Sequence, residues 1–141
     1  MGSIISIDYG LKRVGIAVSD PGRIFAFPSA VLENKSVEYL IKEISNIILE
    51  KEADLILVGM PYNMPGIKIQ KGEMAIKVEK FISKLKEKIS LKIEIIDERL
   101  SSFMAEENLK EAGISSKKSK KFVDAEAARI MLEEYLSKSV S

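Results

Sequence analysis

The sequence predicts an α/β fold in which a mixed sheet begins with an antiparallel hairpin and is flanked by helices. Two short apolar segments near the N-terminus are separated by a few turn residues. Beyond residue 36, segments with helical spacing of apolar residues alternate with short apolar strands. One of these strands, Leu55–Val58, is apolar throughout, as is typical of parallel sheets covered on both faces. These three observations together favour an α/β sheet over an all-β or all-α domain.

The first third of the chain is predicted to form three strands. Ile4–Ile7 and Val14–Ser19 pair across a hairpin loop at Gly10–Arg13, which contains turn-forming residues. A third strand is expected around Ile24–Val31. Pro28 falls inside it, and because proline cannot donate a ladder hydrogen bond, this strand should lie at an edge or contain a bulge.

Helices and two further strands are predicted to follow. Ser36 is a suitable N-cap for an amphipathic helix, and a second helix covers Met74–Leu85 after a loop at Pro61–Gly72. The alternating segment Leu91–Ile95 predicts the last strand. Two helices complete the pattern; the first is capped by Ser101 or Ser102 and ends near Gly113, and the second runs from about Phe122 to Leu136.

Composition limits the chemistry that this chain can perform. The 141 residues carry 22 Lys and Arg against 21 Asp and Glu, with neither Cys nor His. Ser-His-Asp and Cys-His catalysis, disulfides and ordinary zinc sites are therefore excluded. The length suits a single domain over residues 1–141, and the absence of a long apolar run or leader pattern indicates a cytoplasmic protein with no membrane partner.

Carboxylates at strand ends are the candidate functional residues. In an open α/β sheet, ligands bind beyond the carboxyl ends of the parallel strands. Asp8 follows the first strand, and Asp97 and Glu98 follow the last one. Asp97 shares its parity with Leu91, Ile93 and Ile95, which favours it as the buried group, but strand ends twist and Glu98 remains a candidate. Asp124 falls in the first turn of the last predicted helix.

Two other acids are expected to be structural, and each candidate has a plain alternative. Asp54 opens its strand, and Asp20 closes a strand that the hairpin reverses, so both should lie at the opposite edge. Asp8 could serve only a turn, and Asp124 could serve only the helix dipole. Asp97 or Glu98 could simply pair with Arg99 or Lys92 on the surface. However, carboxylates clustered at one edge repel one another unless a cation is present, which makes their joint placement informative.

Four ordered segments resemble the YqgF/RuvX family of Holliday junction resolvase-like proteins. They are Asp8–Asp20, Val58–Met64 with Gly66, Asp97–Ser102, and Asp124 with the alanines that follow it. The resemblance spans nearly the whole chain, although Ser101-Ser102 replaces the usual Thr-Thr and Pro65 stands where Asp is common. It implies an RNase H-like fold related to RuvC: a mixed five-stranded sheet, antiparallel in its first three strands, with two further parallel strands and flanking helices.

The resemblance also implies an activity and a set of site residues. The family is expected to hydrolyse phosphodiester bonds in structured nucleic acid with Mg²⁺ or Mn²⁺, either at the 5′ end of pre-16S rRNA or in branched DNA. Asp8, Asp97, Glu98 and Asp124 match its metal-binding, catalytic carboxylates. Because carboxylates repel phosphates, cations should guide the substrate. The candidates are Lys12, Arg13, Arg99, Lys117, Lys118, Lys120 and Lys121.

Several alternatives are left open by the residues. The lysines between 117 and 121 could belong to a solvated loop without a ligand. The protein could be a non-catalytic nucleic-acid-binding or ribosome-associated factor whose carboxylates are vestigial. An Asp-x-Gly hairpin also begins actin-like ATPases, but those folds need a second domain that this length does not supply. RNA and DNA, a ribosome precursor as partner and a homodimer all remain open.

Overall fold

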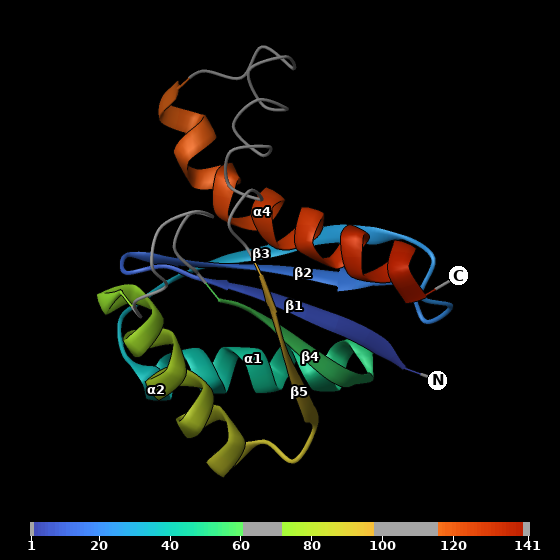
Figure 1. Ribbon diagram of the computed structural model, residues 1–141, viewed down its shortest axis with the longest axis horizontal. Coiled ribbons are helices and arrows are strands. Elements are labelled where there is room, and N and C mark those ends of the chain that lie inside the picture. Colours follow the sequence, from blue (N-terminus) through green and yellow to red (C-terminus); the bar gives the residue numbers. More distant parts are fainter. Residues whose placement is uncertain (1, 61–71, 98–115, 140–141) are drawn as a thin grey trace.

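The computed structural model describes residues 2–60, 72–97 and 116–139, and it gives the backbone alone for residues 97, 116–124 and 139 (Figure 1). The described elements follow one another as three strands, a helix, a strand, a helix, a strand and a helix. They are β1 (Ser3–Tyr9), β2 (Arg13–Ser19), β3 (Ala26–Glu33), α1 (Val37–Lys51), β4 (Ala53–Met60), α2 (Glu73–Lys88), β5 (Lys92–Asp97) and α4 (Ser116–Ser139).

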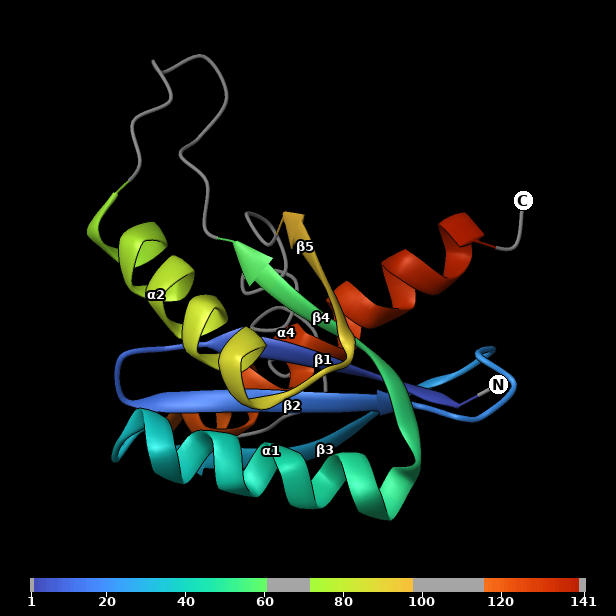
Figure 2. The same cartoon turned by 90° about the horizontal axis from the view of Figure 1, so that it is seen from below.

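The strands of the described residues form one mixed sheet with the order β3-β2-β1-β4-β5. β2 is antiparallel to both β1 and β3, whereas β4 is parallel to β1 and β5 is parallel to β4. Figure 2 shows the arrowheads of β4 and β5 pointing the same way. The mixed five-stranded topology implied by the family resemblance is therefore confirmed.

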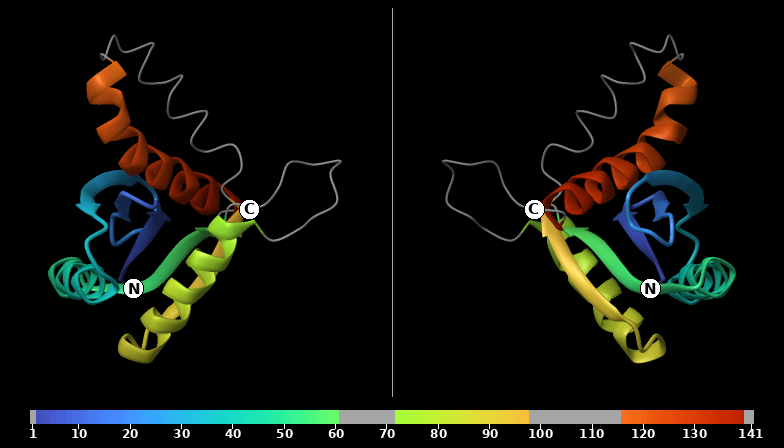
Figure 3. Two further views of the ribbon diagram at one scale, coloured as in Figure 1. Left: turned by 90° about the vertical axis from the view of Figure 1, so that its left-hand side faces the viewer. Right: turned by 90° about the vertical axis from the view of Figure 1, so that its right-hand side faces the viewer.

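Helices cover both faces of the sheet, so that the sheet lies between two apolar layers. Figures 1 and 3 show α1 and α2 on one side and α4 on the other. Alternate residues of β1 serve the two layers: Ile5 and Ile7 pack in the cluster that includes α1 and α2, whereas Ile4 packs with Met131 of α4. This alternation follows from the two-residue period of a strand, and it assigns even-numbered β1 residues to the α4 face.

Local sequence features explain where the first helix begins and ends. The Ser36 side chain accepts a hydrogen bond from the Tyr39 backbone N–H at 3.1 Å, as expected of the N-cap. Glu52 ends the helix in the left-handed conformation, with φ at 53°. Ala53 then starts β4 directly, so the helix passes into the central parallel strand without an intervening loop.

Proline shapes β3 as expected, although the strand begins two residues later than predicted. β3 lies at one edge of the sheet in the described residues. Ala17 pairs with Pro28 and Ile16 pairs with Ala30, so Ser29 is an extra residue in the ladder. This bulge lies beside Pro28, which has no backbone N–H to donate to the ladder. The prediction that this strand lies at an edge or contains a bulge is confirmed, and the structure shows both features.

Two of the predicted helices require comment. The last helix begins at Ser116, not near Phe122, so the segment expected to precede it forms its first turns. Lysine has a helix propensity close to that of leucine, and neither Gly nor Pro interrupts residues 116–139, which explains the earlier start. The helix predicted to end near Gly113 and most of the loop predicted at Pro61–Gly72 lie outside the described residues. Among the helices that are described, none is long and apolar enough to cross a membrane.

Asp20 and Asp54 hold the amino edge of the sheet together, as their positions predict. Asp20 Oδ1 accepts hydrogen bonds from the backbone of Ile24 and Phe25 and so fixes the β2–β3 turn. Asp54 accepts a hydrogen bond from the Gly2 N–H at 3.0 Å and pairs with Arg23. Both acids therefore have structural partners far from the carboxyl end of β1.

The Asp54 contacts give stability a defined pH dependence. The hydrogen bond from Gly2, assisted by the Arg23 charge, lowers the pKa of Asp54 below its ordinary value of 3.8. Because the pKa of Asp54 is lower in the folded state than in the unfolded state, the ionised carboxylate stabilises the fold at pH values above its unfolded-state pKa. This contribution is lost as the pH falls through the folded-state pKa. Asp54→Asn should melt at a lower temperature than the wild type at pH 7, and the difference should shrink below pH 3.8. Thermal melts followed by circular dichroism from pH 7 to pH 2.5 test this; a constant difference would contradict it.

Candidate functional site

The carboxyl ends of three parallel strands meet at one edge of the sheet. β1 ends at Tyr9, β4 ends at Met60 and β5 ends at Asp97. This edge is where open α/β sheets bind ligands, because backbone and loop groups converge there. Asp8 is the penultimate residue of β1 and Asp97 is the final residue of β5, so the sheet brings both positions to the predicted edge.

Asp8 is a buried carboxylate on the α4 face of this edge. Its exposed fraction is only 7%, and it alternates with Ile4 and Ser6 on the face that α4 covers. Glycines stand beside it on both neighbouring strands. Gly15 pairs with Asp8 across β2, and Gly59 follows the residue that pairs with Ile7 on β4. Since neither glycine has a side chain, the sheet itself adds no bulk on either side of the carboxylate.

The register of β5 places Asp97 and Asp8 on different faces. Asp97 pairs with Met60, which belongs to the cluster packed against α1 and α2. The preceding residue, Ile96, pairs with Gly59 and packs with the α4 cluster. Asp97 does share a face of β5 with Ile93 and Ile95, as predicted. However, Ile95 is 48% exposed, so the residues on this face are not all buried near the site. Glu98 lies outside the described residues.

Asp124 belongs to α4, the helix that crosses the Asp8 face. It stands one turn before Ala128, which is fully buried against Ile4 and Ala17. This part of the helix therefore packs on the sheet, and the direction of the Asp124 side chain stays a prediction. Considering only the residues described by the structure, no group of three or more acidic side chains lies together. The predicted set of four carboxylates also stays a prediction.

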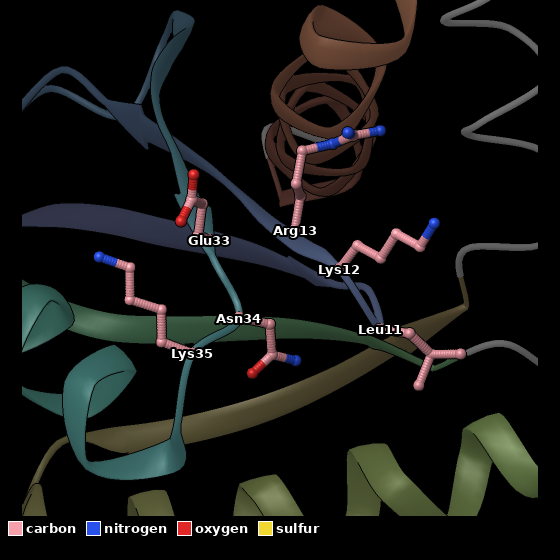
Figure 4. Close-up of a pocket in the computed structure, with 6 residues that line it drawn as sticks. All are labelled: Leu11, Lys12, Arg13, Glu33, Asn34 and Lys35. Atoms are coloured by element: carbon pink, nitrogen blue, oxygen red, sulfur yellow. The ribbon is translucent and has the colours of Figure 1, made fainter.

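The predicted cations fall into two groups. Lys12 and Arg13 form part of the β1–β2 hairpin directly after the Asp8 strand, where they line an open groove (Figure 4). The second group stands in the first turns of α4 and was expected in the segment before a helix. It comprises Lys117, Lys118, Lys120 and Lys121. Arg99 lies outside the described residues.

Asn34 and Lys35, from the connection between β3 and α1, also line this groove and were missed by sequence reasoning. The Asn34 side-chain amide donates to the Gly10 carbonyl at 2.9 Å, and its backbone N–H donates to the Lys12 carbonyl at 2.9 Å. These contacts join segments more than twenty residues apart in the sequence. An Asn-Lys pair between a strand and an N-cap gives no local pattern that would reveal them.

Comparison with known protein families identifies the chain. The family model described as "RuvX: Holliday junction resolvase" matches residues 2–138. The chain belongs to the RuvX family. A relative from Maridesulfovibrio salexigens is 40% identical over 136 residues, which are 96% of this chain and 98% of that protein. One from Desulforamulus reducens is 42% identical over 133 residues, covering 94% and 95% of the two chains. Both RuvX relatives carry the name "Putative pre-16S rRNA nuclease".

Solved structures agree with the RuvX assignment at the level of the fold. The Thermus thermophilus RuvC complex with a Holliday junction superimposes with a TM-score of 0.63 and 12% identity, covering 100% of this chain and 97% of RuvC. The fowlpox virus resolvase in complex with Holliday junction DNA gives a TM-score of 0.56 and 13% identity, with 99% of each chain covered. The expected likeness of this RuvX chain to the RuvC fold is confirmed.

Proposed function

We propose that this protein is a metal-dependent nuclease that hydrolyses phosphodiester bonds in precursor 16S rRNA. The observation that carries the proposal is the buried Asp8 at the carboxyl edge of the sheet, in a chain of the RuvX family. The rRNA substrate is favoured because relatives named for it are up to 42% identical. The junction-bound enzymes of similar fold are 12% and 13% identical.

The chemistry of the donor residues fits Mg²⁺ or Mn²⁺. These hard cations prefer oxygen ligands, and this chain contains neither His nor Cys with which to bind a softer metal. Asp8 contributes a buried carboxylate at the carboxyl edge of the sheet, and its oxygens are hard ligands of the kind that these ions prefer. We propose Asp8, Glu98 and Asp124 as the metal-holding residues. A bound divalent ion would lower the pKa of a water and stabilise the charge on the leaving oxygen.

Strand register favours Glu98 over Asp97 as the carboxylate from β5. Asp97 has the register position of Met60, on the face that packs against α1 and α2. Asp8 belongs to the other face, with Ile4. The even-numbered residues of β5, Glu94 and Ile96, belong to the Asp8 face instead. We therefore propose Glu98, the other acid of this pair, as the metal-holding carboxylate.

Neutralising these two neighbours separately tests the register argument. Glu98→Gln should reduce the single-turnover rate of RNA cleavage about 10²- to 10³-fold, the usual effect of removing one electrostatic stabiliser of a transition state. Asp97→Asn should keep a rate much closer to that of the wild type, because its register position lies on the other face. Cleavage rates of the two variants in Mg²⁺ and in Mn²⁺ provide the measurement. If Asp97→Asn proves the more damaging change, Asp97 is the ligand.

Basic residues supply the contacts to the nucleic-acid backbone in this proposal. The lysines at positions 117, 118, 120 and 121 lie in the first turns of α4, the helix that also contains Asp124. Lys12 and Arg13 follow Asp8 in the β1–β2 hairpin. Such cations bind phosphates irrespective of base sequence and displace counterions from the backbone, which makes binding sensitive to salt. Their arrangement suits a substrate strand that passes over the carboxyl edge.

A cleavage assay with two matched substrates tests the proposed function. A 5′-extended 16S rRNA fragment and a four-way DNA junction are incubated with the protein in Mg²⁺, in Mn²⁺ and in EDTA. We expect metal-dependent cutting of the RNA near the mature 5′ end, with slower or no cutting of the junction. Preferential cutting of the junction would overturn the rRNA assignment. Tight RNA binding without cleavage in either metal would overturn the proposed nuclease activity. The protein would then be a non-catalytic RNA-binding factor.

A further inference from the structure

The groove beside the β1–β2 hairpin is a second candidate contact surface of the molecule. It is open to solvent and has a volume of about 420 Å³. Figure 4 shows that the hairpin forms one wall and the connection from β3 to α1 forms the other. The lining residues are Leu11, Lys12, Arg13, Glu33, Asn34 and Lys35. All of them lie within the described part of the chain.

The two walls of the groove are fixed to each other by hydrogen bonds. The Asn34 amide reaches across to the Gly10 carbonyl, while its backbone N–H bonds to the Lys12 carbonyl, both at 2.9 Å. Gly10 is held tightly within the turn, since a Cβ atom there would come within 2.4 Å of the Arg13 carbonyl oxygen. The spacing between the walls is therefore set before any ligand arrives, which reduces the ordering cost of binding.

The charge of the groove is suited to an extended anion. Three of its residues are cationic and one is acidic. Figure 4 shows Lys12 and Lys35 on opposite walls, with side chains that extend away from each other. The Lys35 ammonium lies 5.0 Å from the centre of the Tyr39 ring, which holds it beside its wall. Two separated cations are a better match for successive phosphates of one strand than for a single small anion.

An apolar contact is also available in the groove. Leu11 is 59% exposed although it is a large hydrophobic residue. Placed next to Lys12, it offers a surface for a ribose or a base while the cations contact phosphate oxygens. A cationic groove that follows the backbone is typical of surfaces that hold single-stranded nucleic acid.

We propose that this groove is a subsite for the sugar-phosphate backbone of a single-stranded RNA segment, with Lys35 as a phosphate contact and Asn34 as a positioning residue. The subsite lies at the β1–β2 hairpin, which follows the Asp8 strand directly, so it would hold the strand beside the carboxyl edge. The inference rests on the proposed function for the identity of the strand. It adds Lys35 and Asn34 to the residues that bind substrate.

Charge reversal at the two ends of α1 tests the subsite. Lys35→Glu alters the groove, whereas Lys51→Glu makes the same exchange roughly 20 Å away at the far end of the helix. Affinity for a fluorescent 5′-extended rRNA fragment is measured by anisotropy in EDTA at several salt concentrations. Lys35→Glu should weaken binding several-fold and reduce the slope of log Kd against log salt by about 0.7 to 0.9. Equal effects of the two variants would overturn the proposal.

Asn34→Ala distinguishes positioning from charge. It removes the bond to Gly10 without changing the number of charges. We expect weaker RNA binding with an unchanged salt slope, in a protein whose melting temperature shows that it is folded. Binding equal to the wild type would remove Asn34 from the subsite.

Failure of the subsite and failure of the nuclease give different results. If the wild type cuts RNA and Lys35→Glu binds RNA normally, the subsite is wrong and the nuclease stands. If the wild type cuts no RNA, but Lys35→Glu binds RNA more weakly and with a smaller dependence on salt, the subsite is supported and the nuclease is not. If the wild type binds no RNA, both proposals are overturned.

Discussion

Asp8→Asn is expected to lower the single-turnover rate of RNA cleavage by about 10²- to 10³-fold or more. The substitution keeps the shape of a buried side chain on the α4 face but removes its negative charge. A neutral amide is a poor ligand for Mg²⁺, so calorimetric titration should show weaker or no binding of Mg²⁺ and Mn²⁺. Affinity for RNA measured in EDTA should be retained or improved, because one source of repulsion towards phosphate is gone.

The opposite edge of the sheet supplies the matched control. Asp20→Asn is the same chemical change at a carboxylate that only fixes the β2–β3 turn. It should leave both the cleavage rate and metal binding close to those of the wild type. Wild-type cleavage by Asp8→Asn would show that the site has been wrongly assigned. Equal losses in the two variants would indicate a general effect on folding.

Phe81→Ala is expected to cause the largest loss of stability, about 3 to 5 kcal/mol in the free energy of unfolding. Phe81 is only 1% exposed and lies in the core between α2 and the sheet. Its ring centre is 4.8 Å from that of Tyr9, which follows Asp8 directly, so the same residue supports the end of β1. Removing the ring leaves a cavity that the packed helices can fill only in part.

Urea denaturation followed by circular dichroism gives the measurement. Phe27→Ala serves as control, because Phe27 is 50% exposed on the edge strand and its truncation should cost about 1 kcal/mol or less. Equal losses for the two variants would contradict the assignment of Phe81 to the core.

Local patterns in the sequence predicted those parts of the fold that depend on neighbouring residues. Ser36 marks the start of α1 because a hydroxyl there can satisfy a free backbone N–H, and the structure shows this bond to Tyr39. Pro28 predicted an edge position or a bulge for β3 because proline lacks a backbone N–H, and the structure shows both. The parallel pairing of β4 agrees with its continuous apolar run.

Features that depend on tertiary contacts could not be predicted in the same way. Strand alternation shows that Asp97 shares a face with Ile93, but only the pairing with Met60 shows that this face is opposite to that of Asp8. The hydrogen bond between Asn34 and Gly10 joins two connections that are separated in the sequence by β2 and β3, so no local pattern reveals it. The start of α4 was placed too late because a run of lysines indicates solvation as readily as it indicates a helix.

The outer strands of the sheet have consequences for how copies of this chain could associate. In the described residues, β3 combines Pro28 with a bulge, and β5 carries an ion pair between Lys92 and Glu94. A proline, a broken ladder and charged side chains all oppose the addition of a foreign strand. Crowded molecules should thus resist joining edge to edge into fibres through β3 or β5.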